Sequence, residues 1–213
     1  DAGNSAAVAS GRRNPGVGRF VNFYYNGTDI YNDVSVNYCV HEMFAEKQAD
    51  TLVIRFNDTK GIWSKWQPAA GDTVRFKEGA SDTGKMFIHS MKPENGLFTI
   101  RAMSMPKTAK IRKSKSWEGV RFLQLANEFA GNHGLTFKNY GCEDQVYPYI
   151  KQSNEGDFSL FSRLCMLEGC QMLIFDGSLL AYNEHYIEQQ EPAGGLTVDE
   201  NGVFTYEDNR DTM

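Results

Sequence analysis

The sequence of 213 residues lacks several features that would indicate a function directly. No stretch approaches 18 consecutive apolar residues, so we expect no membrane span. There is no excess of basic residues, because 22 lysines and arginines stand against 27 aspartates and glutamates and leave a net charge of −5. A protein whose main role is to grip nucleic acid usually has a basic domain, so we expect no specific nucleic-acid partner.

Cysteine and histidine are scarce and irregularly spaced. A disulfide framework needs a denser cysteine pattern, and a structural zinc site needs four ligands. The four cysteines are Cys39, Cys142, Cys165 and Cys170. The four histidines are His41, His89, His133 and His185, none of them three or four residues from another. We expect buried thiols in a protein made in a reducing cytoplasm, and no metal site.

Motifs that carry chemistry are also missing. The chain has no Gly-x-Ser-x-Gly elbow, no phosphate-binding Walker loop and no Gly-x-Gly-x-x-Gly after a strand. A glycosidase uses a pair of acids for catalysis. Glu118 with Glu128, and Glu143 with Asp144, are pairs of this kind, but in a chain with 27 acids such pairs also arise by chance. We expect no catalytic and no cofactor-binding residues, no cofactor, and no enzyme activity.

What the sequence does contain is a series of short strands over residues 19–106. Apolar and aromatic residues alternate with polar ones, and turn signals such as Asn26-Gly27 and Asn95-Gly96 separate them. Helical spacing is limited to one short turn around Gly61 to Trp66. Trp63 and Trp66 in that loop either cover one end of a β domain or stack on a carbohydrate or peptide. The pattern predicts a small antiparallel β-barrel.

A basic stretch, residues 107–115, follows the strands and has the sequence KTAKIRKSK. We interpret it as a solvated linker, with a contact for a partner or nucleic acid as the alternative. Residues 116–190 then show helical spacing in two segments, each followed by a strand. The first helix is expected after an N-cap at Ser116, with His133 capping or packing at its end. The second is expected after Ser153, with Phe161 on its apolar face and Gly169 at its end.

The two ends differ from the rest. Residues 1–18 are small and polar and predict a flexible arm. Residues 191–213 carry Pro192 and a glycine pair near their start, and Leu196 to Tyr206 could form a hairpin turned at Asn201-Gly202. Such a late segment cannot complete a core, so either the chain is truncated within a second barrel or the segment docks elsewhere. The expected fold class is α+β, mainly β: a barrel, a two-helix α/β module, and the start of a second barrel.

Several of these stretches resemble one protein family in their order and spacing. Ala49 to Phe76 carries Asp58, then Gly61-Ile62-Trp63, Trp66-Gln67-Pro68 and Gly71-Asp72 between two strands. Ser116 to Leu135 and Gln152 to Tyr182 follow, the latter with Gln152, Ser153, Asp157-Phe158, Phe161, Arg163-Leu164 and Gly169. From about Phe20 to Tyr182 the chain is similar to phage tail baseplate hubs: the late control protein D family and the hubs of PBSX-like prophages and R-type bacteriocins.

The resemblance implies a structural role in a contractile tail or phage-like particle, between the tail tube protein and the spike protein. Family members are homotrimers whose two barrels per chain match a sixfold tube, and they are located in the virion baseplate after synthesis in the bacterial cytoplasm. The alternative functions are a tail-associated peptidoglycan hydrolase or a glycan-binding module.

Overall fold

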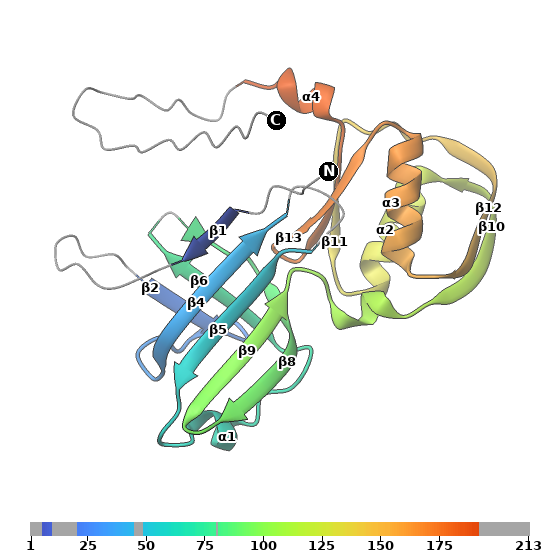
Figure 1. Cartoon of the computed structure of the whole chain (residues 1–213). Coiled ribbons are helices and arrows are strands. Elements are labelled where there is room, and N and C mark those ends of the chain that lie inside the picture. Colours follow the sequence, from blue (N-terminus) through green and yellow to red (C-terminus); the bar gives the residue numbers. More distant parts are fainter. Residues whose placement is uncertain (1–5, 10–20, 45–48, 80, 192–213) are drawn as a thin grey trace, which may run out of the picture.

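The computed structural model describes residues 6–9, 21–44, 49–79 and 81–191. These residues form a β module that ends near Pro106 and an α/β module that follows it (Figure 1). The expected class, α+β and mainly β, is confirmed. None of the helices in this part of the chain is both long and apolar enough to cross a membrane.

The β module is one antiparallel sheet with its strands in the order β1-β4-β5-β9-β8-β6-β2-β3, and β7 pairs with β6. Its strands are β1 (Ala6–Ala9), β2 (Val21–Tyr25), β3 (Thr28–Asp29), β4 (Ser35–Met43), β5 (Thr51–Asn57), β6 (Thr73–Glu78), β7 (Ser81–Asp82), β8 (Met86–Glu94) and β9 (Leu97–Met103). In Figure 1, β2 and β6 cross behind β4 and β5, so the sheet folds over its own core. No pairing among the described residues joins β3 to β1, so in this part of the chain the predicted β-barrel is an open sheet.

Two of the predicted turns are confirmed by their backbone angles. Asn26 and Gly27 both have positive φ, 46° and 83°, and Asn95 and Gly96 have 48° and 76°. Two successive residues of this kind make the turn that best fits the twist of a hairpin. The first turn closes β2 onto β3, and the second closes β8 onto β9.

The core of the β module is built around Trp63. The short helix α1 (Ile62–Trp66) holds it, and the Asp58 Oδ1 atom accepts the N–H group of Ile62 at 2.6 Å. The Trp63 ring is 1% exposed and stacks on Phe98 with ring centroids 5.3 Å apart, while Phe56 lies at 4.7 Å. Trp66 packs edge-on against Trp63 and stays 40% exposed. Both tryptophans therefore cover one end of the sheet, which is the first of the two roles that the sequence suggested for them.

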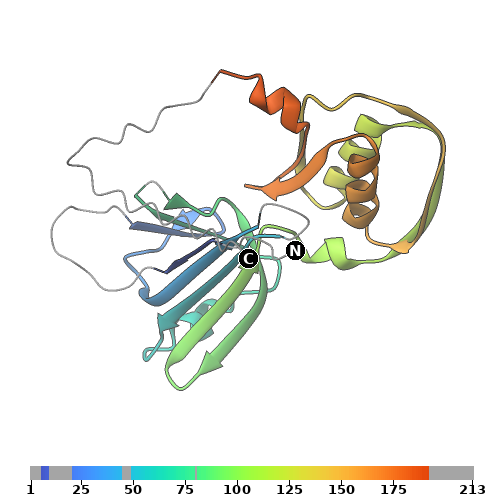
Figure 2. The same cartoon turned by 45° about the horizontal axis from the view of Figure 1, so that its top comes forward.

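In the α/β module, a two-stranded ribbon and a three-stranded sheet enclose two helices. Its elements are β10 (Lys113–Arg121), α2 (Phe122–Asn132), β11 (Thr136–Tyr140), β12 (Val146–Glu155), α3 (Asp157–Leu167), β13 (Gln171–Phe175), β14 (Ser178–Tyr182) and α4 (Glu184–Glu188). Figures 1 and 2 both show α2 and α3 side by side, with the β10–β12 ribbon on one side and β11, β14 and β13 on the other. Phe122, Phe129 and Phe161, all 0% exposed, fill the space between these layers.

The structure corrects the predicted start of the first helix. Ser116 does not cap a helix but lies within β10, opposite Lys151 of β12. The helix begins at Phe122, and its cap comes from Asp144, whose Oδ1 atom accepts the Leu123 N–H group at 2.9 Å. Gly119 has a φ of 58°, which a helix interior does not allow. Pairing with β12 therefore outweighs the helical spacing of residues 116–121. The predicted start of the second helix is corrected as well, because Ser153 lies within β12 and the helix begins at Asp157.

The connection between the modules is shorter than the predicted linker of residues 107–115. Residues 107–110 form a 3-10 turn, η1 (Lys107–Lys110), in which Ala109 is buried against the α/β core. Lys113 and Lys115 belong to β10 and pair with Asp157 and Glu128. Residues 110–112, which are exposed and lie between η1 and β10, retain the character of a solvated linker.

The ends of the chain lie mostly outside the described residues. Of the arm expected over residues 1–18, only Ala6–Ala9 is described, and it pairs with Met43 to Val40 of β4 as strand β1. The expected hairpin and second barrel, within residues 191–213, fall outside the described part apart from residue 191.

Limited proteolysis can test the connection between the two modules. Trypsin is expected to make its first cut within residues 49–191 after Lys110 or Arg112, because both are exposed while Lys113 and Lys115 are held in ion pairs. Mass spectrometry of a short digestion would locate the cut. A chain cut first elsewhere in this range, with residues 107–115 intact, would contradict the two-module description.

Candidate functional site

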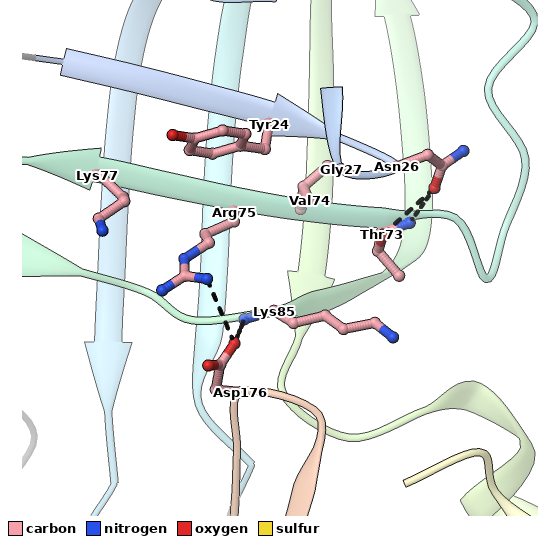
Figure 3. A pocket seen from close by; sticks show the side chains of 9 residues that line it. All are labelled: Tyr24, Asn26, Gly27, Thr73, Val74, Arg75, Lys77, Lys85 and Asp176. Carbon is pink, nitrogen blue, oxygen red and sulfur yellow. Dashed lines mark hydrogen bonds and ion pairs between the residues drawn. The ribbon is translucent and has the colours of Figure 1, made fainter. Parts of the chain in front are cut away.

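A cleft opens where the turn between β13 and β14 meets the β module. It has a volume of about 580 Å³ and is drawn in Figure 3. The residues that line it are Tyr24, Asn26, Gly27, Thr73, Val74, Arg75, Lys77, Lys85 and Asp176. All but Asp176 come from the β module, so the cleft is complete only while the two modules are in contact.

The register of β2 and β6 accounts for the polar floor of the cleft. Tyr24 lies directly opposite Arg75, and Asn22 lies opposite Lys77, so these four side chains share one face of the sheet. Their neighbour Phe23, which is 0% exposed, points to the core on the opposite face. Asn26 closes one end, where its Oδ1 atom accepts the Thr73 N–H group at 2.8 Å.

Positive charge dominates this floor. The Arg75 guanidinium donates twice to Asp82, from Nε at 2.8 Å and from Nη2 at 2.6 Å, and Lys77 Nζ lies 3.0 Å from the same carboxylate. The hydrogen bonds from Arg75, together with the Gly84 N–H group, hold the pKa of Asp82 far below its usual value although burial opposes them. Among the described residues, Lys85 Nζ has no carboxylate partner, and it lies 5.4 Å from the centre of the Phe87 ring.

Asp176 joins the two modules at the rim of the cleft. Its Oδ1 atom accepts the backbone N–H group of Lys85 at 2.9 Å and lies 3.8 Å from Arg75 Nη1. Gly84 allows this approach, because a Cβ atom there would lie 3.1–3.2 Å from Asp176. We call the contact of Gly84 and Lys85 with Asp176 the latch.

Gly84→Ala is expected to open the latch. A Cβ atom at Gly84 would force Asp176 away, at a cost of about 1–2 kcal/mol beyond the strain of a positive φ. Gly79→Ala is the matched control, because its φ of 60° is close to the 64° of Gly84 and nothing lies within 4 Å of its Cβ position. Hydrogen exchange should show faster exchange of the Lys85 amide in Gly84→Ala alone. Equal exchange in both variants would contradict the latch.

A buried polar cluster lies on the other side of the α/β module, at Asp157. This side chain is 1% exposed and accepts hydrogen bonds from Lys113, Asn132, Gln152 and His133 at 2.9–3.1 Å. Burial raises the pKa of Asp157, but the hydrogen bonds outweigh it and keep the pKa below its usual value. The same cluster reaches the connection between the modules, since His133 Nδ1 lies 2.9 Å from Thr108 Oγ1.

Three histidines are expected to make the free energy of unfolding depend on pH. Burial lowers the pKa values of His41, His89 and His133 below 6.5, so the folded state binds fewer protons than the unfolded state below that pH. The free energy of unfolding should therefore fall as the pH drops from 7.5 to 5. His41 Nε2 is buried without a hydrogen-bond partner in the described part of the chain, so His41→Leu should make the slope shallower. Urea melts at several pH values test this, and an unchanged slope would contradict it.

The acids considered as catalytic pairs serve structural purposes or stay apart. Glu128 accepts Lys115 Nζ at 2.6 Å and Trp117 Nε1 at 3.1 Å, while Glu118 is exposed on β10. Asp144 caps α2, as described above, and Glu143 beside it is exposed. In each pair, therefore, one acid makes a structural contact and the other faces solvent.

The cysteines are buried, as expected. All four are free, and burial raises the pKa of Cys39 and of Cys165 to about 12. His133 packs at the end of α2 within the Asp157 cluster, which confirms the expected structural role. No group of three or more His, Cys, Asp or Glu side chains that could hold a metal ion occurs in residues 6–9, 21–44, 49–79 and 81–191.

The cleft itself was not predicted from the sequence. The basic residues on β6 alternate with apolar ones, and this pattern predicts only which side of the strand faces solvent. Asp176 stands 91 residues from Lys85, in the tight turn between β13 and β14. Nothing local in the sequence indicates that this turn reaches the β module.

Comparison with known proteins shows that this chain shares its fold with solved structures. No protein-family model matches the chain, and no curated protein does. Among solved structures, the 43 kDa tail protein of prophage MuSo2 from Shewanella oneidensis matches with a TM-score of 0.54 and 12% identity, over 77% of this chain and 54% of that one. The tail protein from Neisseria meningitidis MC58 matches with a TM-score of 0.57 and 10% identity, over 78% and 50%. The chain therefore spans about half the length of these two proteins.

Proposed function

We propose that the chain is a structural component of a phage tail or phage-like particle, and more specifically part of a baseplate hub that connects the tail tube to the spike. The observation that carries this proposal is the fold shared with two tail proteins over more than three quarters of the chain. The order of the motifs from Ala49 to Tyr182, similar to the late control protein D family, supports the hub as the position.

The contacts between the modules suit a scaffold. A hub has to hold its parts in a fixed relation while force passes along the tail. Here the latch joins the modules at the cleft, and Phe87 of β8 is buried within the core of the α/β module. These contacts support a fixed arrangement of the two modules.

The chemistry of the described residues supports a structural protein and not an enzyme. The groups most often used in catalysis are engaged in packing: His133 and Asp157 bind each other, and the thiols are buried with raised pKa values. We therefore propose no substrate and no cofactor. A peptidoglycan hydrolase remains the function to test against, because tail proteins work at the cell wall.

Assembly of the hub is proposed to use the open edges of the β module. Among the described residues, β1 pairs only with β4, so its other edge can accept a strand from a neighbouring molecule. Three copies of a longer protein that carries a second barrel would supply six such modules, which matches a sixfold tail tube. With one module, the interface could fall below the roughly 1,000 Å² of a stable association.

Sedimentation velocity tests this proposal. The 213-residue chain is expected to be a monomer or a weak oligomer, and a longer protein with a second barrel is expected to be a trimer. Dye release from stained cell walls should stay at the buffer level for both. A longer protein that is monomeric at high concentration would contradict the hub, and dye release by the chain would favour the hydrolase.

A further inference from the structure

Two asparagine-glycine turns of the β module share a backbone conformation and differ in what holds the asparagine side chain. Asn26 and Asn95 have φ angles of 46° and 48°, and the glycines that follow them have 83° and 76°. Both asparagines are exposed, and both turns join neighbouring antiparallel strands. The two sites therefore form a matched pair, in which a difference in reactivity would come from the contacts of the side chain.

An asparagine that is followed by glycine can lose its side-chain amide without an enzyme. The backbone nitrogen of the glycine attacks the asparagine Cγ atom, a five-membered ring closes, and the amide nitrogen leaves as ammonia with the proton of the glycine N–H group. Water then opens the ring at either carbonyl, which leaves aspartate or isoaspartate. Glycine favours this attack because it has no side chain and leaves the backbone free to turn. The asparagine amide has to rotate toward the next backbone nitrogen before the bond can form.

The Asn26 amide is restrained against this rotation. Its Oδ1 atom accepts the Thr73 N–H group at 2.8 Å and the Thr73 hydroxyl at 3.3 Å. The Asn26 N–H group donates to the Thr73 carbonyl oxygen at 2.8 Å, so the backbone and the side chain are both tied to β6. Attack by the Gly27 nitrogen on Asn26 has to break the bonds to the side chain first.

The Asn95 amide has no such restraint. Its side chain makes no hydrogen bond to another described residue, and both Asn95 and Gly96 are exposed to water. The Gly96 carbonyl oxygen accepts the Asp58 N–H group at 2.7 Å, which holds the far side of the turn and leaves the Asn95 amide able to rotate. The two turns thus differ at the reacting side chain.

We propose that Asn95 is a site of spontaneous deamidation, and that Thr73 suppresses the same reaction at Asn26. The product carries one more negative charge than asparagine, directly after Glu94 in the sequence. Isoaspartate also lengthens the backbone of this two-residue turn by one methylene group. The inference rests on the two turns alone and does not depend on the proposed role in a tail.

The turn at Asn95 supports the loop that positions Trp63. Figure 1 shows this turn, between β8 and β9, at the same end of the β module as α1. The Asp58 N–H group donates to Gly96, and the Asp58 carboxylate in turn accepts the Ile62 N–H group at the start of α1. An isoaspartate at position 95 would displace Gly96 and weaken this support, whereas an aspartate keeps the backbone and tolerates a positive φ.

Prolonged incubation of the chain at mildly alkaline pH, followed by peptide mass spectrometry, tests the proposal. We expect Asn95 to convert about five- to tenfold faster than Asn26, the factor to which one hydrogen bond corresponds. The control is the same chain in concentrated guanidinium chloride, where no fold restrains either side chain and the two rates should be similar. An Asn26 rate equal to or above that of Asn95 in the folded chain would overturn the proposal, and so would a ratio that persists in the denaturant.

Asn95→Asp provides the second arm, because it places the new charge in an unchanged backbone. Urea melts followed by tryptophan fluorescence should give this variant nearly the midpoint of the original chain. The fraction that carries isoaspartate at position 95, separated by chromatography, should unfold at lower urea. Equal midpoints for the isoaspartate fraction and the original chain would overturn the link between this turn and α1.

Discussion

Phe161→Ala is expected to destabilise the α/β module by about 3–5 kcal/mol. The ring is 0% exposed and stacks on Phe122 at 5.2 Å between centroids, with Phe129 and Phe137 each at 6.3 Å. Truncation to alanine removes three aromatic contacts at once and leaves a cavity between α2, α3 and β11. Chemical denaturation followed by near-ultraviolet circular dichroism would report the loss.

Leu167→Ala is the control for this variant. It lies on the same helix, but its side chain is 70% exposed, so a change within about 0.5 kcal/mol of the original protein is expected. If Phe161→Ala melted like Leu167→Ala, the packing of α3 described above would be wrong.

Asp157→Ala is the second substitution with a large expected effect, about 3 kcal/mol or more. Its carboxylate is the common acceptor for Lys113, Asn132, Gln152 and His133, and removing one member of a buried ionic cluster leaves the others unsatisfied. The Lys113 side chain is 40% exposed and can turn to water, which keeps the expected cost at the lower end of the range for buried pairs.

The exposed ion pair between Glu155 and Arg163 supplies the comparison for Asp157. Glu155→Ala should cost less than about 1 kcal/mol, because the Arg163 side chain is 54% exposed and its charge stays solvated. Urea denaturation at pH 7 would separate the two variants. Similar costs for both would mean that the Asp157 cluster contributes no more than a surface pair does.

Much of the β module could be predicted from local sequence. Strand β9 (Leu97–Met103) lies within the predicted series of strands, because residues that alternate between core and solvent fit an extended strand in a half-buried sheet. The turns at Asn26-Gly27 and Asp176-Gly177 were also predictable, since few residues other than asparagine, aspartate and glycine accept a positive φ there. Such features depend on neighbours in the sequence.

Features set by distant residues were missed or misplaced. The helical spacing from Ser116 onward continues through Val120, which is buried as a helix residue would be. Residues of β12 that lie 27 to 35 positions away in the sequence nevertheless pair with this stretch and make it a strand. The cap of α2 is Asp144, which follows the helix in the sequence, so no pattern before the helix could reveal it. The cleft depends on the contact of Lys85 with Asp176 and could not be found without the tertiary fold.

The central claim is that this chain is a structural part of a tail, positioned between tube and spike. Co-sedimentation of a longer protein that carries a second barrel, together with the tail tube and spike proteins of the same particle, tests it most directly. We predict one complex that contains both partners, with three copies of the protein, and a tube that no longer binds when the β1 edge carries a proline. A protein that sediments apart from both tube and spike, at concentrations where these two assemble with the rest of the tail, would contradict the claim.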